Sequence, residues 1–172
     1  MRMIPVAASK NVWVAAMVSD EDYQYLSQFT WRLDPHGYAQ RQVYSHRSTG
    51  VKKYSHYRRF MMHREVMGIT DSRVRLDHRN RNRLDNQRSN LRIASAQQNN
   101  FNNGGKPGQR KSRYKGVSPA DSTQNPWRAN IFDNGKQQHL GCFATEEDAA
   151  RAYNDFARKL HGEFAFQNEV SE

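Results

Sequence analysis

The sequence predicts an α+β fold in two parts, and three features of the chain lead to this prediction. Short runs with strand-like alternation of hydrophobic and polar residues fill much of residues 1–60 and 113–143. Helical spacing is confined to short segments and to one longer segment after residue 145. Residues 102–112 are rich in Asn, Gly and Lys, a composition typical of a linker. We therefore expect one domain over residues 1–101, a basic linker over 102–112 and a second domain over 113–168.

The composition is that of a basic, folded chain. Only 36% of the 172 residues are hydrophobic, but 11% are aromatic, which is more than a disordered chain usually carries. The formal net charge of +10 suits a protein that binds nucleic-acid phosphates. Cys142 is the only cysteine, so neither an internal disulfide nor a zinc site of CxxC pairs can form. Because no hydrophobic run has the length of a membrane span or signal peptide, we expect a cytoplasmic protein.

The positive charge is concentrated in the middle of the chain. From Arg47 to Arg92 there are 13 Lys and Arg against 4 acidic residues, a net charge of +9. Five more basic residues and no acidic ones lie between Lys106 and Lys115, whereas residues 116–172 carry a net charge of −4. Scattered surface charge would not need this asymmetry, which favours a polyanionic ligand for the middle of the chain.

Short strands and turns dominate the prediction for the first domain. Residues 11–18 are strand-like, and Ser19 opens a capping pattern for a short helix on which Tyr23, Leu26 and Phe29 recur at helical spacing. Further strands are expected over residues 31–33, 38–44 and 52–57, with turns at 34–37 and 48–50. Residues 60–67 form a short helix or strand that ends at Gly68.

The segment 72–103 is expected to fold as strand, loop, strand and helix. Residues 73–78 alternate as a strand should, residues 79–89 are polar and turn-rich, and residues 91–94 form a second strand. Ser95 then begins a capping pattern for a short helix that reaches about Phe101.

Three strands and one helix are expected in the second domain. The strands cover residues 114–118, 127–132 and 137–143, and Asn134-Gly135 makes a hairpin turn between the last two. A helix starts at Thr145, and its hydrophobic stripe is expected to contain Ala149, Ala152 and Tyr153, Phe156 and Leu160. The helix must pack on one face of the sheet, which leaves the other face available.

The strand–loop–strand–helix segment carries the residues for phosphodiester hydrolysis. This reaction needs an activated water, neutralisation of the phosphate charge and help for the leaving oxygen. Asp77 and Asn99 supply the oxygen ligands that Mg²⁺ or Mn²⁺ prefers. His78 is the natural general base, and Asn90 could orient its ring.

Other polar residues nearby have simpler interpretations. Asn82, Asp85 and Asn86 are interpreted as turn residues, and His63 as a packing or phosphate-contact residue. The arginines of this region are expected to contact phosphates: Arg64, Arg79, Arg81, Arg83 and Arg88.

These motifs resemble the HNH nucleases with a ββα-metal fold, above all the phage and intron-associated homing endonucleases. The resemblance lies in Asp77-His78, Leu84-Asp85-Asn86, Ser89-Asn90-Leu91-Arg92 and Asn99, with Met62-His63-Arg64 upstream. It implies His78 as general base, Asp77 and Asn99 as ligands of one metal ion, and Asn90 as the middle Asn of the motif. Many members have His at the position of Asn99, so the metal preference stays open between Mg²⁺ and Mn²⁺.

The second domain resembles the AP2 DNA-binding domains. The resemblance covers most of residues 113–168 and lies in Tyr114-Lys115-Gly116-Val117, Trp127-Arg128-Ala129, His139-Leu140-Gly141-Cys142-Phe143, Ala149-Ala150-Arg151-Ala152-Tyr153-Asn154 and Gly162-Glu163-Phe164-Ala165. It implies a three-stranded antiparallel sheet backed by a helix, with the sheet in the major groove of DNA. The expected contact residues are Lys115, Ser118, Arg128, Asn130, Phe132, Gln137 and His139, preceded by Arg110, Lys111 and Arg113 from the basic segment. Several of these differ from the arginines of the plant regulators, so base preference cannot be transferred.

Together these features predict a site-directed DNA endonuclease of the homing type, acting as a monomer on double-stranded DNA in a phage-infected or bacterial cell. Two alternatives stay open. The chain could be a sequence-specific DNA-binding regulator without chemistry, or it could bind or cleave RNA. The outer face of the second domain could also be an ordinary solvated face, since residues 116–172 carry a net charge of −4.

Overall fold

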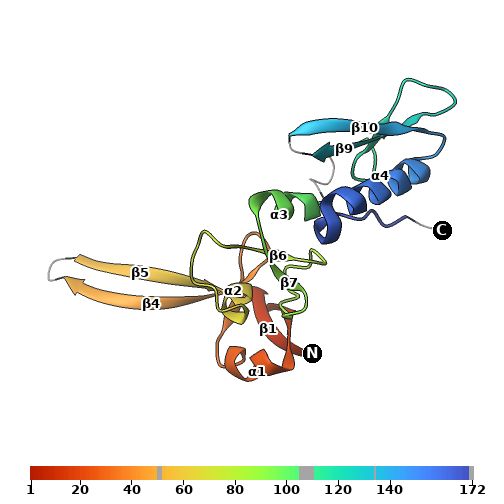
Figure 1. Ribbon diagram of the computed structural model, residues 1–172. Coiled ribbons are helices and arrows are strands. Elements are labelled where there is room, and N and C mark those ends of the chain that lie inside the picture. The colour runs from red at the N-terminus through yellow and green to blue at the C-terminus, as the bar shows by residue number, and fades with distance from the viewer. Residues whose placement is uncertain (50–51, 105–110, 134, 171–172) are drawn as a thin grey trace. The chain divides into compact units, whose positions relative to one another are not determined.

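The computed structural model describes residues 1–49, 52–104, 111–133 and 135–170 (Figure 1). The chain forms two compact units, Met1–Ser95 and Ala96–Glu172. Four α-helices and several β-sheets make up the described residues, which confirms the predicted α+β class. Most of the predicted linker lies outside the described residues, so the domain limits at 101 and 113 stay a prediction.

A five-stranded sheet forms the centre of the first unit (Figure 1). Its strand order is β2-β1-β3-β4-β5, in which β1 and β3 are parallel and the other neighbours are antiparallel. The strands are β1 (Arg2–Ser9), β2 (Val12–Val18), β3 (Trp31–Leu33), β4 (Ala39–Thr49) and β5 (Lys52–Met61). Four of them match predicted strands, whereas β1 was not predicted as a separate element. The predicted turn at 48–50 is wrong at Ser48 and Thr49, which pair with β5 as the end of β4, and residue 50 lies outside the described residues.

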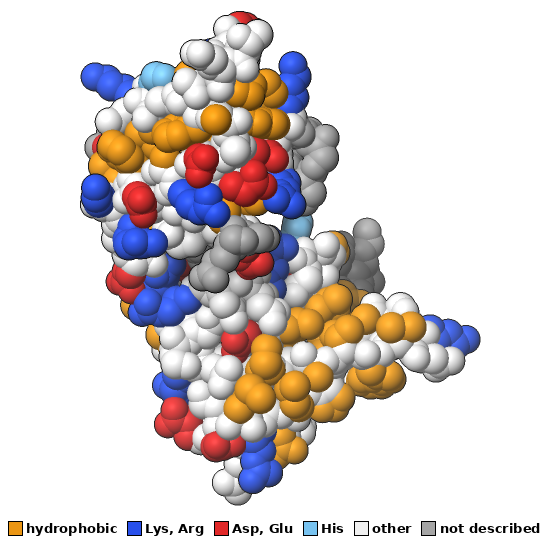
Figure 2. Space-filling view, turned by 90° about the vertical axis from the view of Figure 1, so that its right-hand side faces the viewer, with side chains coloured by type: hydrophobic (Ala, Val, Ile, Leu, Met, Phe, Trp, Pro, Cys, Tyr) orange, Lys and Arg blue, Asp and Glu red, His pale blue; other side chains and the backbone are white. Residues whose placement is uncertain are grey.

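One face of this sheet is the core of the first unit. Ile4, Val6 and Trp31 are almost completely buried against α1 (Asp20–Leu26) and α2 (Met62–Val66). The Trp31 indole donates a hydrogen bond to the Leu26 carbonyl at 2.9 Å, which satisfies its polar atom inside the core. The opposite face leaves side chains such as Met3 and Trp13 exposed, and Figure 2 shows hydrophobic side chains gathered on one side of this unit.

The predicted strand–loop–strand segment follows as a separate two-stranded sheet. Strand β6 (Arg75–His78) pairs antiparallel with β7 (Leu91–Ala94), and Leu91 joins the core of the unit. The connecting loop is pinned to β2, because the Met17 amide donates to the Leu84 carbonyl and the Asn86 amide donates to the Met17 carbonyl, both at 2.8 Å. The loop between Asp77-His78 and Asn90 is therefore an ordered part of the first unit.

The second unit begins with α3 (Ala96–Asn102) and contains a three-stranded antiparallel sheet in the order β10-β9-β8. The strands are β8 (Val117–Pro119), β9 (Trp127–Asp133) and β10 (Lys136–Phe143), and α4 (Glu146–His161) and a 3₁₀ turn (Gly162–Phe164) follow. Thr145 caps α4 as predicted, since its Oγ1 accepts a hydrogen bond from the Asp148 amide at 3.1 Å. Of the predicted Asn134-Gly135 turn, only Gly135 is described.

The hydrophobic stripe of α4 differs from the prediction. The buried residues are Ala149, Ala150, Tyr153 and Ala157, whereas Phe156 is 38% exposed and Leu160 is 40% exposed. The three-stranded sheet is narrow and covers only the helix face at spacing i, i+4. Phe156 and Leu160 lie toward one margin of that face and stay partly exposed.

The fold contains no membrane-spanning candidate in the part of the chain that the structure describes. None of its helices is both long and apolar enough to cross a bilayer.

Candidate active site and nucleic-acid interface

Asp77 and His78 occupy the last two positions of β6, and both are nearly buried, with exposures of 6% and 5%. Asp77 faces Arg92 across the two-stranded sheet. Its Oδ2 accepts from Arg92 Nε at 2.8 Å and from Arg92 Nη2 at 2.7 Å. This buried ion pair fixes the carboxylate and neutralises part of its charge. Sequence reasoning did not assign Arg92 this role.

The His78 ring is held by Asn86, a residue that the sequence indicated only as a turn former. Asn86 is completely buried, and its Nδ2 donates to the Leu84 carbonyl at 3.3 Å. That bond turns Oδ1 toward His78, where it lies 3.4 Å from Nε2. A carbonyl oxygen can only accept, so this contact is a hydrogen bond in the tautomer, or in the protonated ring, that carries a proton on Nε2. Burial lowers the pKa of His78, against a raising effect of Asn86 and of the nearby Asp77.

Asn90 does not orient the His78 ring as the sequence led us to expect. Its Oδ1 accepts from the Asn80 amide at 3.0 Å, and its Nδ2 donates to Asn80 Oδ1 at 3.0 Å and to the Asp85 carbonyl at 2.8 Å. The Asn90 carbonyl also accepts from the Arg79 amide at 2.9 Å. Asn90 therefore closes the loop that carries Asn86.

Two further rings face His78. The His63 ring centroid lies 5.4 Å from that of His78, and the Tyr38 ring lies 5.8 Å from it and 5.2 Å from His63. Burial, together with the nearby His78, lowers the pKa of His63 to about 3, so this ring is neutral near pH 7. The structure thus gives His63 a packing position, one of the two roles that the sequence indicated.

Known proteins resemble this chain in two ways. Neither a protein-family model nor a solved structure matches it. However, it is 33% identical over 155 residues to an HNH endonuclease of Acanthamoeba polyphaga mimivirus, an alignment that covers 90% of this chain and 75% of the viral protein. The chain belongs to the HNH endonucleases.

The present chain also matches plant proteins, over about a third of its own length. It is 45% identical over 56 residues to APETALA2-like protein 2 of Oryza sativa and 43% identical over 56 residues to the AP2-like ethylene-responsive transcription factor TOE2 of Arabidopsis thaliana. These alignments cover only 13% and 11% of the plant proteins. They support an AP2 domain in the chain.

The predicted metal ligands of the HNH endonuclease lie in different compact units. Asp77 lies near the end of β6 in the first unit, and Asn99 lies on α3 in the second. A carboxylate and a carboxamide are hard oxygen donors, so their chemistry fits Mg²⁺ or Mn²⁺. No group of three or more His, Cys, Asp or Glu that could hold a metal ion occurs among the described residues, and the predicted pair is not such a group.

The free face of the three-stranded sheet has the predicted alternation. Ala129 and Ile131 are buried beneath α4, whereas Phe132 is 61% exposed. Register places Gln137 opposite Phe132 and His139 opposite Asn130. The outward set comprises Ser118, Arg128, Asn130, Phe132, Gln137 and His139. Within this set, His139 Nδ1 and Asn130 Oδ1 lie 3.2 Å apart.

The predicted phosphate contacts differ in their surroundings. Several already bind protein groups: Arg64 donates to the Asp71 and Val74 carbonyls, Arg83 to the His36 carbonyl, Arg88 to Asp22, Arg113 to Glu147, and Lys115 to the Phe101 and Asn103 carbonyls. Arg79, Arg81 and Lys111 are exposed, and Arg110 lies outside the described residues.

Proposed function

We propose that the chain is a site-directed DNA endonuclease, a homing endonuclease that hydrolyses one phosphodiester bond with a single divalent metal ion and His78 as general base. The observation that carries this proposal is the arrangement of His78. It is buried and adjacent to Asp77, and its Nε2 lies 3.4 Å from Asn86 Oδ1, so in the proposed tautomer Nδ1 serves as the base. A general base needs this combination of a fixed ring and an unprotonated nitrogen at neutral pH.

The proposed reaction begins when His78 Nδ1 takes a proton from a water molecule. The resulting hydroxide attacks phosphorus, and the bond from phosphorus to the leaving oxygen breaks. Asp77 and Asn99 would hold the metal ion, which when bound neutralises phosphate charge and assists the leaving group. Arg92 keeps the Asp77 carboxylate in place, and Asn90 keeps the His78 loop in place.

The second unit is proposed to choose where the chain cuts. The outward set of the three-stranded sheet would lie in the major groove, as the AP2 resemblance implies, with carboxamide groups able to bind base edges. Basic residues between the two domains would contact the phosphate backbone. In this arrangement the ββα-metal segment is the cutting part and the AP2-like domain the reading part.

Nicking of supercoiled plasmid DNA tests the proposal. A duplex enriched from a random-sequence library by the full-length protein in EDTA is first cloned into the plasmid. Wild-type protein should then nick it with Mg²⁺ or Mn²⁺ but not with EDTA, and His78→Ala should abolish nicking. His36→Ala, at an exposed histidine of the same unit, is the matched control and should nick normally. Undiminished nicking by His78→Ala would reject the proposed base.

The match to plant AP2 proteins favours a second candidate, a DNA-binding regulator without chemistry. The same protein preparations decide between the two. A gel shift with the enriched duplex, combined with no nicking at any metal concentration, would favour the regulator.

A further inference from the structure

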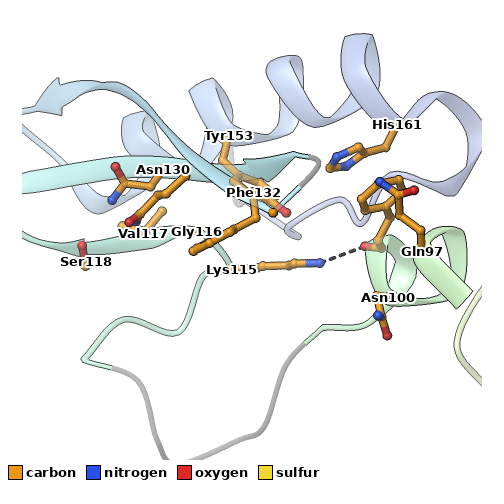
Figure 3. Close-up of a pocket in the computed structure, with 13 residues that line it drawn as sticks. Gln97, Asn100, Lys115, Gly116, Val117, Ser118, Asn130, Phe132, Tyr153 and His161 are labelled. Atoms are coloured by element: carbon orange, nitrogen blue, oxygen red, sulfur yellow. Dashed lines mark hydrogen bonds between the residues drawn. The ribbon is translucent and has the colours of Figure 1, made fainter.

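Helix α3 packs against α4 and is hydrogen-bonded to Lys115 of the second unit. The Phe101 ring stacks on His161 of α4 with a centroid distance of 3.6 Å and an interplanar angle of 10°. Lys115 Nζ donates to the Phe101 carbonyl at 2.8 Å and to the Asn103 carbonyl at 2.6 Å, and so binds the end of α3 (Figure 3). This explains why α3 belongs to the second unit although it follows β7 directly.

A hollow of about 490 Å³ is lined by α3, by the three-stranded sheet and, through Tyr153 and His161, by α4 (Figure 3). Its polar lining comes from both sides: Gln97 and Asn100 of α3, and Ser118, Asn130 and Gln137 of the sheet. The exposed Phe132 ring adds an aromatic surface. Among the described residues, the carboxamides of Asn100 and Gln137 make no hydrogen bond. Carboxamides beside an exposed aromatic ring are the groups that bind base edges and stack on bases.

The two sides of α3 have different surroundings. At about 100° per residue, Gln97, Asn100 and Phe101 share the side that lines the hollow. Asn99 lies roughly 150° from the mean direction of that side. Helix α3 therefore carries the proposed metal ligand Asn99 on one side, while its other side lines the hollow beside the sheet face that is proposed to read DNA.

We propose that α3 is part of the DNA-reading surface, and that Gln97 and Asn100 contact bases or backbone of the duplex bound by the sheet. The inference rests on the proposed function, because it takes duplex DNA as the ligand of the sheet. The hollow is continuous with the outward set through Ser118, Asn130 and Gln137, so DNA on that face reaches α3. DNA binding would then hold the Asn99 helix in position during cleavage.

Binding measurements on full-length variants test the contact. The probe is the enriched duplex in EDTA, and the variants are the pair Gln97→Ala with Asn100→Ala, the sheet variant Gln137→Ala, and Gln124→Ala as an exposed carboxamide outside the hollow. The α3 pair and Gln137→Ala should each weaken binding by about fivefold or more, whereas Gln124→Ala should not. If only Gln137→Ala weakens binding, the inference fails and the proposed DNA face stands. If neither weakens it, both fail.

His161 variants test the packing of α3 against α4. The His161 ring stacks on Phe101, and this contact is the one that the variants change. His161→Phe should bind the enriched duplex as wild type does, and the amide hydrogens of α3 should exchange as slowly as in wild type. His161→Ala should speed that exchange and weaken binding of the enriched duplex by about as much as the α3 pair does. Unchanged exchange and binding in His161→Ala would overturn the assignment of His161 as a positioning residue.

Discussion

Burial keeps the two histidines that face each other in the first unit unprotonated near neutral pH. The pKa of His78 lies below its ordinary value, and that of His63 falls to about 3. A protonated His63 beside His78 would hinder proton uptake by the base, since like charges repel at this distance. The neutral state of His63 therefore supports the proposed role of His78.

The pH dependence of nicking should follow the pKa of His78. Because the base form exists above this pKa, the acidic limb of kcat/KM should have its midpoint below 6.5. Asn86→Asp places a carboxylate at Nε2, which favours the protonated ring and should move the midpoint to higher pH. Asn86→Ala, the matched variant, removes the contact without adding charge and should lower kcat. Equal midpoints in wild type and Asn86→Asp would contradict this account of His78.

Loss of Asp77 should affect stability as well as activity. Asp77→Asn leaves Arg92 buried without its counter-charge, which should cost about 3–5 kcal/mol in the free energy of unfolding. The double variant Asp77→Asn with Arg92→Met removes both charges and should regain most of this stability without nicking. Urea unfolding and plasmid nicking on the same samples separate the two effects. A double variant as unstable as Asp77→Asn would show that the unpaired charge of Arg92 is not the cause of the lost stability.

Acid should destabilise the first unit through His63. Its folded pKa of about 3 lies below the ordinary 6.5, so the unfolded chain binds the extra proton as the pH falls between these values. The stabilising contribution is complete above pH 6.5 and is lost at up to about 1.4 kcal/mol per pH unit below it. Urea unfolding from pH 7 to pH 4.5 should show a shallower decline for His63→Phe than for wild type. An equal decline of the unfolding free energy in both proteins would rule out His63 as the source of the acid destabilisation.

At the scale of elements, the second unit depends on a tight approach at Gly116. Its φ of +78° is a left-handed conformation, and an added Cβ would lie 2.1 Å from the buried Tyr153 ring and 2.6 Å from the Asn130 carbonyl. Gly116→Ala should therefore destabilise this unit by at least about 2 kcal/mol. Gly135→Ala has a similar φ with open space around the Cβ and is the matched control, with a smaller loss. Thermal unfolding of the two variants measures the difference.

The elements could be predicted where a local pattern determines them. Alternation located β9, and the Thr145 capping pattern located the start of α4. The contact of Asn86 with His78 was not predictable, because an Asn that forms a turn and an Asn that holds a histidine ring have the same local pattern. The predicted hydrophobic stripe of α4 was wrong at Phe156 and Leu160 for a similar reason. The width of the sheet that buries a helix is a tertiary property.

The grouping of α3 with the second unit illustrates the same limit at the scale of the whole molecule. Chain order places α3 directly after β7, so the sequence predicted it as the end of the first domain. Contacts from His161 and Lys115, 60 and 14 residues beyond Phe101, place it in the second unit. The proposed metal ligands Asp77 and Asn99 therefore belong to different units.

The salt dependence of DNA binding should show which basic residues act as phosphate contacts. Each phosphate neutralised by a cation contributes about −0.9 to the slope of log K against log salt. Lys111 is exposed without an ion-pair partner among the described residues, whereas Arg113 binds Glu147 at 2.7 Å. Lys111→Gln should make the slope shallower by about 0.9 and weaken binding equally for all duplexes. Arg113→Gln should change the slope less, because Glu147 already offsets its charge. Titrations at about 50 to 200 mM salt measure the slope for each variant. Enriched and scrambled duplexes show whether binding weakens equally for both. A larger change for Arg113→Gln than for Lys111→Gln would mean that DNA displaces Glu147, and that the ion pairs of the free protein do not predict its phosphate contacts.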